Sequence, residues 1–393
     1  MTTIRRAVIG GCALGFATGW NIANTGSVAG QLAGAYGVGL AAIGLFTTAL
    51  FITHAGMQIP AGRAADRFGA RRTGMVALTL ILTFNLVALA APDLAIALTA
   101  RLLIGVGTGL GFIAGSAYVR SKSGSAFAQG IYGGAELGGG GLALAIVPAV
   151  AAWIGWRAPF ATAVILALGG LALLASGPPD GLRRRQLREK HVPSGVLRDV
   201  RLYKLAVLFS FSLGLSVVLG NWVTTLLQRE GGMSRGAAGV IAALTLVLGV
   251  ASRPIGGWIL HTRPGRIRAA VGASLVAGAI GSLALAAATP PALTVFGAML
   301  IGVAAGIPFA PTFQGAARLR PDAQAAAVGF VNGAASMVIL VGTPLLGLTF
   351  SFPGGGRTGF VAVAVLWALA LLLLPSAHAL AAEVRPGSES PSG

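Results

Sequence analysis

Charged residues are scarce in this chain. Asp, Glu, Lys and Arg make up only 10% of its 393 residues, whereas 55% are hydrophobic. An ordinary globular domain carries about 25% charged residues. The mean hydropathy of +0.83 and the shortage of polar residues exclude a soluble protein of this length. The composition therefore indicates an all-α protein that crosses a membrane many times.

Cysteine and acidic residues are rarer still. The single cysteine, Cys12, lies in the first apolar run, so the chain can form neither an internal disulfide nor a cysteine metal cluster. No Gly-x-x-x-x-Gly-Lys-Ser/Thr motif occurs, which argues against a nucleotide as the energy source. Nothing resembles a catalytic triad or a set of metal ligands. We therefore expect no enzymatic activity, no metal and no cofactor.

Basic residues outnumber acidic ones by 28 to ten, which gives a net charge of +18. Such a charge can indicate nucleic-acid binding, but its placement argues otherwise. When the loops are assigned alternately to two sides, one side holds 22 Lys and Arg, the other holds four, and Arg101 and Arg253 lie within apolar runs. By the positive-inside rule the rich side is cytoplasmic and carries both termini. The chain should lie in the inner (plasma) membrane and contact anionic headgroups, with no nucleic-acid partner.

Twelve apolar stretches are long enough to cross a bilayer, since a spanning helix needs about 20 residues. The first is expected to be a retained helix and not a signal peptide, because it continues past Trp20 without a cleavage site. The expected spans are 7–33, 40–61, 73–91, 94–118, 126–153, 159–176, 205–227, 237–260, 269–288, 292–317, 323–351 and 358–377.

The spans fall into two groups of six. The predicted domains are an N-terminal six-helix bundle at 1–177, a cytoplasmic basic linker at 178–204, a C-terminal six-helix bundle at 205–380 and a disordered tail at 381–393. The end of the linker, around 198–201, is expected to form an interfacial helix. The remaining loops are too short to hold a soluble catalytic domain.

A short basic hinge joins the second and third spans. Its sequence from Gly62 to Arg72 is Gly-Arg-Ala-Ala-Asp-Arg-Phe-Gly-Ala-Arg-Arg. Asp66 stands there among four arginines, so we expect it to have a specific partner, either an arginine or the positive N-terminal end of another helix. A weaker copy begins 195 residues later at Gly257, with His261 in the place of the acid. The two hinges indicate a duplicated membrane protein.

These motifs resemble those of the major facilitator superfamily of secondary transporters. Gly62-x-x-x-Asp66-Arg67-x-Gly69-x-Arg71-Arg72 resembles its signature loop, Arg101 followed by Gly105 resembles its fourth-helix motif, and Gly155-Trp156-Arg157-x-x-Phe160 resembles the usual start of its sixth helix. The resemblance implies twelve helices in two pseudo-symmetric bundles, alternating access to a site between them, and a monomer. It also implies that Gly62, Asp66, Arg67, Gly69, Arg71 and Arg72 form a conformational latch, with Asp66 near the inner N-terminus of the eleventh helix.

Ionisable residues inside a membrane are costly and are therefore functional candidates. Glu136, in the span 126–153, is the only acid within any span, and we expect it to take up and release a proton in each cycle. Arg101 could pair with Glu136, either as part of that switch or as a permanent link between the fourth and fifth helices. The resemblance assigns Arg101 to proton transfer. His54 is a third proton-coupling candidate, with a hydrogen-bonded packing role as the alternative.

Polar side chains on the helices that line the cavity of the resembled fold are candidates for substrate binding. Each could instead make a hydrogen bond between helices. Arg253 could face the cavity and bind an anion, or extend to the inner interface and brace the second hinge. The candidates are Trp20, Asn21, Asn24, Asn221, Trp222, Arg253, Gln314 and Asn332. In the glycine-rich fifth span, Gly134-x-x-x-Gly138 predicts a close-packing face.

The spans hold two arginines against one carboxylate, which favours negatively charged substrates. The sequence therefore predicts a secondary active transporter that imports a small, possibly anionic solute with protons. The alternative is proton-driven efflux of drug-like or metabolite compounds, with Glu136 as the counter-charge. Either way, the partners are a small molecule, the bilayer and a proton gradient.

Overall fold

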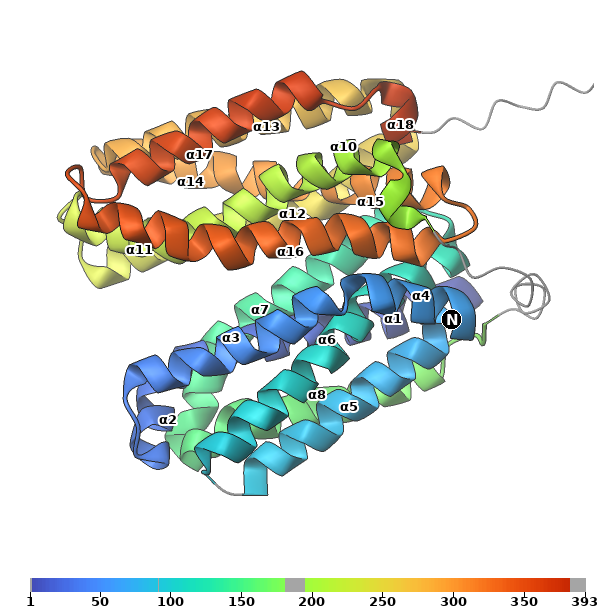
Figure 1. Cartoon of the computed structure of the whole chain (residues 1–393), viewed down its shortest axis with the longest axis horizontal. Coiled ribbons are helices and arrows are strands. Elements are labelled where there is room, and N and C mark those ends of the chain that lie inside the picture. Colours follow the sequence, from blue (N-terminus) through green and yellow to red (C-terminus); the bar gives the residue numbers. More distant parts are fainter. Residues whose placement is uncertain (1, 91, 181–194, 382–393) are drawn as a thin grey trace, which may run out of the picture.

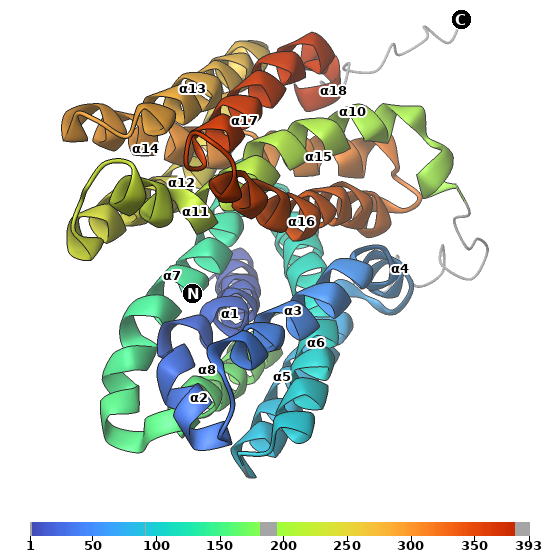
Figure 2. The same cartoon turned by 60° about the vertical axis from the view of Figure 1, so that its left-hand side comes forward.

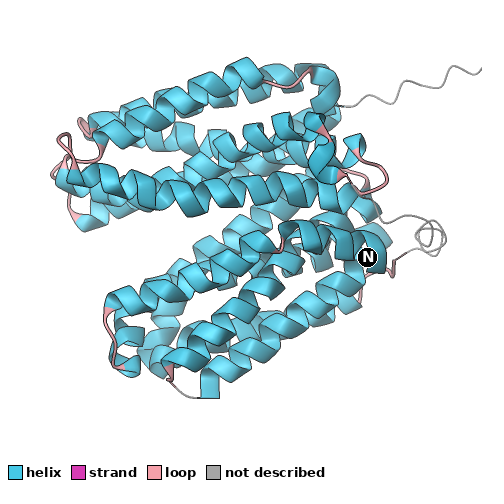
Figure 3. Cartoon of the chain, viewed as in Figure 1, coloured by secondary structure: helices cyan, strands magenta, loops and turns pink. Residues whose placement is uncertain are grey.

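The computed structural model describes residues 2–90, 92–180 and 195–381, and that part of the chain is helical with no strand (Figure 3). The N-terminal half contains α1 (Thr3–Ala23), α2 (Ala29–Tyr36), α3 (Leu40–Gly56), α4 (Gln58–Phe68), α5 (Ala70–Ala90), α6 (Leu94–Ser123), α7 (Ala126–Ile154) and α8 (Ala158–Ala175). The C-terminal half contains α10 (Val200–Phe209), α11 (Leu215–Arg229), α12 (Arg235–Thr262), α13 (Ile267–Ala287), α14 (Pro291–Gly306), α15 (Phe309–Leu319), α16 (Gln324–Leu348), α17 (Arg357–Ala370) and α18 (Ala377–Ala381).

These helices make twelve crossings, as predicted. Eight stretches are long and apolar enough to cross a membrane, and one of them, Ala126–Ala175, contains both α7 and α8. The pair α3 and α4 forms one further span that bends by 50° at its break. The helix α1 and the shorter apolar stretch Arg357–Leu373 complete the twelve. Two further spans are also built from two helices each, α10 with α11 and α14 with α15.

Several of the predicted boundaries are wrong. The second span ends at Phe68 and not at 61, and the fourth ends at Ser123 and not at 118. The first helix ends at Ala23 and does not reach residue 33, because the polar run 24–27 (Asn-Thr-Gly-Ser) offers the backbone other hydrogen bonds. The seventh helix begins at Val200, five residues before the predicted 205, with Asp199 as its N-cap. The expected interfacial helix near Arg198 is only a 3₁₀ turn, Val196–Arg198. Most of the predicted linker, 181–194, and nearly all of the predicted tail, 382–393, lie outside the described residues.

The two bundles lie side by side and meet most closely at one end. Figure 1 shows them together at the end that carries α4, α15 and α18, and diverging toward the end that carries α2. We call the first of these the basic end, because the α4–α5 loop brings Arg67, Arg71 and Arg72 there. Figure 2 shows the two contacts between the bundles, with α16 beside α4 and α12 beside α7.

Glycines allow the backbones of the two bundles to touch. A Cβ atom on Gly62 of α4 would lie 2.4 Å from the carbonyl oxygen of Ala325 in α16. A Cβ atom on Gly257 of α12 would lie 2.2 Å from that of Ala126 in α7. These two glycines lead the two hinges in the sequence, so the duplication places the same close contact on both sides of the molecule.

Only one of the two glycines in the predicted packing face of α7 contacts another helix. Gly134 lies against α12, where a Cβ atom would be 3.0 Å from the carbonyl oxygen of Val250, but a Cβ atom on Gly138 would meet nothing within 4 Å. Gly130, one turn earlier, is the closer contact, at 2.4 Å from the carbonyl oxygen of Arg253. The small-residue face of α7 that packs on α12 is therefore shifted toward the basic end.

Candidate functional site

An ion pair joins the two bundles where α7 meets α12. Arg253 of α12 places Nη1 3.0 Å from Oε2 of Glu136, and the same nitrogen donates to the carbonyl oxygen of Gly133. The guanidinium carbon lies 4.6 Å from the centre of the Phe309 ring. The side chain of Arg253 is 1% exposed and that of Glu136 is 13% exposed. Glu136 is therefore paired across the bundle interface, with a small part of its side chain still exposed.

This pair corrects two expectations from the sequence. Glu136 is not paired with Arg101, because its partner comes from the other half of the protein. Arg253 does not extend to the membrane interface, because its guanidinium is buried between α7 and α15. A signal for the contact was present in the duplicated hinges, since Arg253 precedes Gly257 by four residues just as Gln58 precedes Gly62.

Gln58 occupies the equivalent position on the other side of the molecule. Its Oε1 accepts a hydrogen bond from Nδ2 of Asn332 in α16, at 2.8 Å, and its Nε2 donates to the carbonyl oxygen of His54. Asn332, predicted as a substrate-binding residue, therefore bridges the bundles in this structure. The two pseudo-symmetric contacts differ in charge: Gln58–Asn332 is neutral, whereas Glu136–Arg253 is ionic.

Arg101 lies in the interior of the N-terminal bundle. It is fully buried, its Nε donates to the carbonyl oxygen of Phe46 at 3.2 Å, and its Nη1 donates to Oδ1 of Asn24 at 3.3 Å. In the described part of the chain it makes no ion pair. These contacts tie α6 to α3 and to the end of α1, which is a positioning role. Its predicted part in proton transfer stays a prediction.

His54 makes hydrogen-bonded packing contacts, which were the alternative to a role in proton coupling. Its Nδ1 lies 3.1 Å from Oγ1 of Thr108 in α6, and its ring stacks on Phe51 at a centroid distance of 5.6 Å. The side chain is buried. A neutral, hydrogen-bonded packing role accounts for these contacts, and proton relay through His54 stays a prediction.

The three candidates on α1 face into their own bundle. Trp20 Nε1 donates to Oγ1 of Thr162 at 3.0 Å, Asn21 Oδ1 accepts from Nδ2 of Asn85 at 2.9 Å, and Asn24 Nδ2 donates to the carbonyl oxygen of Pro159 at 2.8 Å. All three are buried. The alternative of hydrogen bonds between helices fits them, so we do not include them in the candidate binding site. Asn85, which the sequence did not single out, is an amide in an otherwise apolar span.

The candidates of the C-terminal half differ in their availability. Asn221 Nδ2 donates to Oγ1 of Thr343 at 3.1 Å, and Trp222 Nε1 donates to the carbonyl oxygen of Thr343 at 2.8 Å, so both join α11 to α16. Asn221 is exposed and keeps its carbonyl oxygen available. Gln314 of α15 is buried, and its Nε2 has no partner among the described residues. An unpartnered buried amide is costly, which favours a ligand role for Gln314.

The signature loop joins the two bundles at the basic end, because Asp66 contacts the N-terminus of α16. Asp66 accepts hydrogen bonds from the backbone nitrogens of Ala325 and Ala326, at 3.1 and 2.9 Å, at the N-terminus of α16. A carboxylate is favoured there by the unpaired N–H groups and by the helix dipole. Arg67 lies over the ring of Phe68, its guanidinium carbon 5.2 Å from the ring centre. The geometry predicted for Asp66 is therefore present, and its action as a latch stays a prediction.

The rest of the loop holds the N-terminal bundle itself. Gly69 adopts φ = +103°, which favours glycine, and turns the chain into α5. Asp180 accepts from the backbone nitrogens of Arg71 and Arg72, at 3.3 and 3.4 Å, so it caps α5 as Asp66 caps α16. Arg71 Nε also donates to the carbonyl oxygen of Leu174 at 3.0 Å. The sequence placed Asp180 in the linker, and its capping role was missed.

Replacing Asp66 with Asn is expected to lower the transport turnover about tenfold while the protein stays folded. Asn keeps one acceptor but loses the negative charge and the second acceptor, so the closed basic end is weakened by about 1–2 kcal/mol. Asp180→Asn is the matched control, because it makes the same change at a cap within one bundle. Turnover in proteoliposomes and melting temperature should be measured for both; equal turnover loss in the two variants would count against a latch.

The chain is similar to known transporters along most of its length. The family model described as Major Facilitator Superfamily matches residues 10–322. A curated relative, the "Probable sulfoacetate transporter SauU" of Cupriavidus necator, is 29% identical over 266 residues, which is 61% of this chain and 62% of the relative.

Three solved structures share the fold over nearly the whole chain. The human organic anion transporter MFSD10 superposes with a TM-score of 0.72 at 16% identity, covering 95% of this chain and 100% of that one. The proton:xylose symporter XylE gives 0.70 at 15% identity, covering 94% of each chain, and the E. coli fucose:proton symporter FucP gives 0.71 at 15% identity, covering 94% and 98%. With its twelve crossings, its signature loop on the eleventh helix and this family match, the chain belongs to the major facilitator superfamily of membrane transporters.

Proposed function

We propose that this protein is a proton-coupled secondary active importer of a small organic anion, working by alternating access. The observation that carries the proposal is the ion pair between Glu136 and Arg253, which is buried, ionic and shared between the two bundles. The basic end is assigned to the cytoplasm, both termini lie there, and the chain acts as a monomer in the inner membrane.

The pair gives a physical reason for coupling. Without substrate, the charges of Glu136 and Arg253 cancel. When a monoanion binds Arg253 and a proton binds Glu136, the net charge of the site is again zero. An anion that arrives without the proton leaves an uncompensated negative charge in a low-dielectric site, which costs several kcal/mol. Proton and anion are therefore expected to bind together and to move in the same direction.

The same exchange links binding to conformation. The basic end, which we assign to the cytoplasm, is closed by Gly62 against Ala325, by Asp66 at the N-terminus of α16, and by Glu136 with Arg253. A proton on Glu136 and an anion on Arg253 remove the ionic contact between the bundles. The remaining contacts then hold the closed end less tightly, which shifts the population toward the cytoplasm-open state.

The substrate class follows from the charge of the site. A guanidinium matches a carboxylate or a sulfonate in geometry and charge. The curated relative is described as a probable sulfoacetate transporter, so sulfoacetate is the first anion to test. Sulfoacetate is a dianion at neutral pH, so a second proton is needed to leave the site neutral, and a monoanion is tested beside it. The unpartnered amide of Gln314 supplies a further donor for a polar group of the solute.

The test is uptake into proteoliposomes with an imposed pH gradient, using radiolabelled sulfoacetate, methanesulfonate, taurine and xylose, with protein-free liposomes as the control. We expect at least one of the two anions to accumulate when the outside is acidic, with little uptake of zwitterionic taurine or neutral xylose. Accumulation of xylose alone, or anion uptake that ignores the pH gradient, would refute the proposal. Efflux is the rival function: it predicts that expression raises resistance to toxic lipophilic compounds and that no anion accumulates.

A further inference from the structure

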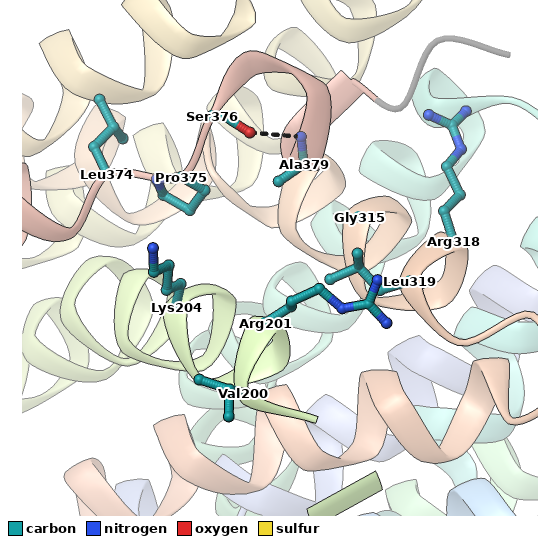
Figure 4. Close-up of a pocket in the computed structure, with 10 residues that line it drawn as sticks. All are labelled: Val200, Arg201, Lys204, Gly315, Arg318, Leu319, Leu374, Pro375, Ser376 and Ala379. Atoms are coloured by element: carbon teal, nitrogen blue, oxygen red, sulfur yellow. Dashed lines mark hydrogen bonds between the residues drawn. The ribbon is translucent and has the colours of Figure 1, made fainter. Parts of the chain in front are cut away.

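The C-terminal bundle contains a cavity at the basic end that the transport site does not use. It has a volume of about 600 Å³ and lies between the start of α10, the end of α15 and the segment that runs from Leu374 into α18 (Figure 4). Three cationic side chains and several apolar ones line it, among them Arg201, Lys204, Arg318, Leu319, Leu374 and Pro375.

The cavity is positively charged. Among the described residues no acidic side chain lines it, although Asp199 next to it forms an ion pair with Arg201. Arg201 is held in place by Asp199, with Nε 2.9 Å from Oδ1 and Nη2 2.8 Å from Oδ2, and its hydrogen bonds lower the pKa of Asp199. Lys204 makes no hydrogen bond or ion pair within the part of the chain that the structure describes. Figure 4 shows its ammonium group extending from α10 toward Pro375.

The corresponding place in the N-terminal bundle is filled. There the chain that follows α8 packs against the end of α6: Tyr118 donates its hydroxyl to the carbonyl oxygen of Pro178 at 2.8 Å, and Lys122 donates to that of Pro179. In the C-terminal bundle, Gly315 of α15 lines the cavity and lies close to α18, where a Cβ atom would be 2.5 Å from the carbonyl oxygen of Ala379. Lys122 therefore donates to a backbone oxygen, whereas Lys204 faces an open cavity.

Exposed apolar residues border the cavity. Val200, which lines it, is 73% exposed, and Leu372, two residues before Leu374, is 81% exposed. In a membrane protein such side chains face lipid tails. A cationic cavity beside a lipid-facing apolar edge fits an amphiphile that carries a negative headgroup.

We propose that this cavity binds the phosphate of an anionic phospholipid of the cytoplasmic leaflet, with Lys204 and Arg201 contacting the phosphate and the acyl chains lying along Val200 and Leu372. Charge complementarity favours this occupant: an ammonium and a guanidinium on one helix turn match a phosphodiester. Such a lipid ties α10, α15 and α18 together at the basic end. The proposal is independent of the transported solute.

The test is a lipid titration of the purified full-length protein, read by melting temperature and by native mass spectrometry. Short-chain phosphatidylglycerol is expected to bind about tenfold more tightly than phosphatidylcholine. Lys204→Gln should lower the affinity for phosphatidylglycerol about tenfold. Lys122→Gln removes the same charge from the filled site and should leave binding unchanged. Ala379→Leu narrows the cavity without changing charge and should also weaken phosphatidylglycerol binding.

Three results would overturn the lipid assignment. They are equal binding of the two lipids, an unaltered affinity in Lys204→Gln with the protein folded, and inorganic phosphate that stabilises the protein as well as phosphatidylglycerol does. The last result would indicate a soluble phosphate ligand. None of these measurements depends on transport, so a failed uptake experiment leaves the lipid proposal intact, and the reverse also holds.

Discussion

Proteoliposomes that carry Glu136→Gln are expected to lose proton-driven accumulation of the anion entirely. With a 1:1 coupling, a pH difference of one unit is worth about 1.4 kcal/mol and supports about tenfold accumulation by the unmodified protein. Gln cannot take up the proton, so the accumulation ratio should fall to about one. Its amide oxygen can still accept the hydrogen bond that Arg253 Nη1 now gives to Oε2 of Glu136. Because the variant leaves the buried charge of Arg253 without a carboxylate, it should be less stable than the unmodified protein, but the retained hydrogen bond should let it fold and still exchange substrate for substrate.

The same variant should also change how anion binding depends on pH. In the unmodified protein Glu136 competes with the substrate for Arg253, so protonation of Glu136 frees Arg253 and binding tightens as the pH falls. In Glu136→Gln no competitor remains, and the affinity should become high and independent of pH. Binding can be measured by calorimetry at pH 5, 6, 7 and 8. A variant whose affinity still tightens in acid would assign the proton to another group, with His54 the next to test.

Glu230→Gln is the matched control for this experiment. Glu230 also forms an ion pair, with Oε2 3.3 Å from Nε of Arg357, but both residues belong to the C-terminal half and lie away from the bundle interface. The two side chains are 27% and 42% exposed, so the pair contributes little to stability. Accumulation in this variant should equal that of the unmodified protein.

The twelve crossings and the duplication could be predicted from the sequence because hydropathy and the repeated hinge are properties of one chain segment at a time. The contact of Asp66 with α16 was implied by the family resemblance, whereas the residues alone left either an arginine or a helix N-terminus as its partner. The boundaries of α1 and α10 were less certain, since capping residues such as Asp199 decide them and apolar runs do not.

The partner of Glu136 could not be predicted by the same means. The two residues of the pair are 117 positions apart and come together only when the bundles pack. The direction in which the α1 side chains point could not be predicted either. A helix that is apolar on every face does not indicate which face lines the cavity. Trp20, Asn21 and Asn24 therefore looked like cavity residues, whereas the structure turns them toward Thr162, Asn85 and Pro159.

Arg253→Met is expected to abolish anion transport and to destabilise the protein more than any other substitution discussed above. Removing one partner of a buried pair leaves the other uncompensated, at a cost of about 3–5 kcal/mol. The loss of the Arg253 guanidinium from the bundle interface should also weaken anion binding at least about a hundredfold. Arg357→Met, which breaks the exposed pair with Glu230, should retain both properties.

A double-mutant cycle separates the two roles of Arg253. The double variant Glu136→Gln/Arg253→Met has no buried charge at the interface, so most of the stability lost in Arg253→Met should return, and anion binding should not. Arg253→Lys tests the geometry: its single ammonium keeps the charge but cannot reproduce the guanidinium contacts to Glu136, Gly133 and the Phe309 ring together. The melting temperature and the sulfoacetate affinity are measured for the four proteins of the cycle. If the double variant transports the anion, Arg253 acts only as a structural partner of Glu136; if it is stable and inactive, Arg253 is the anion receptor.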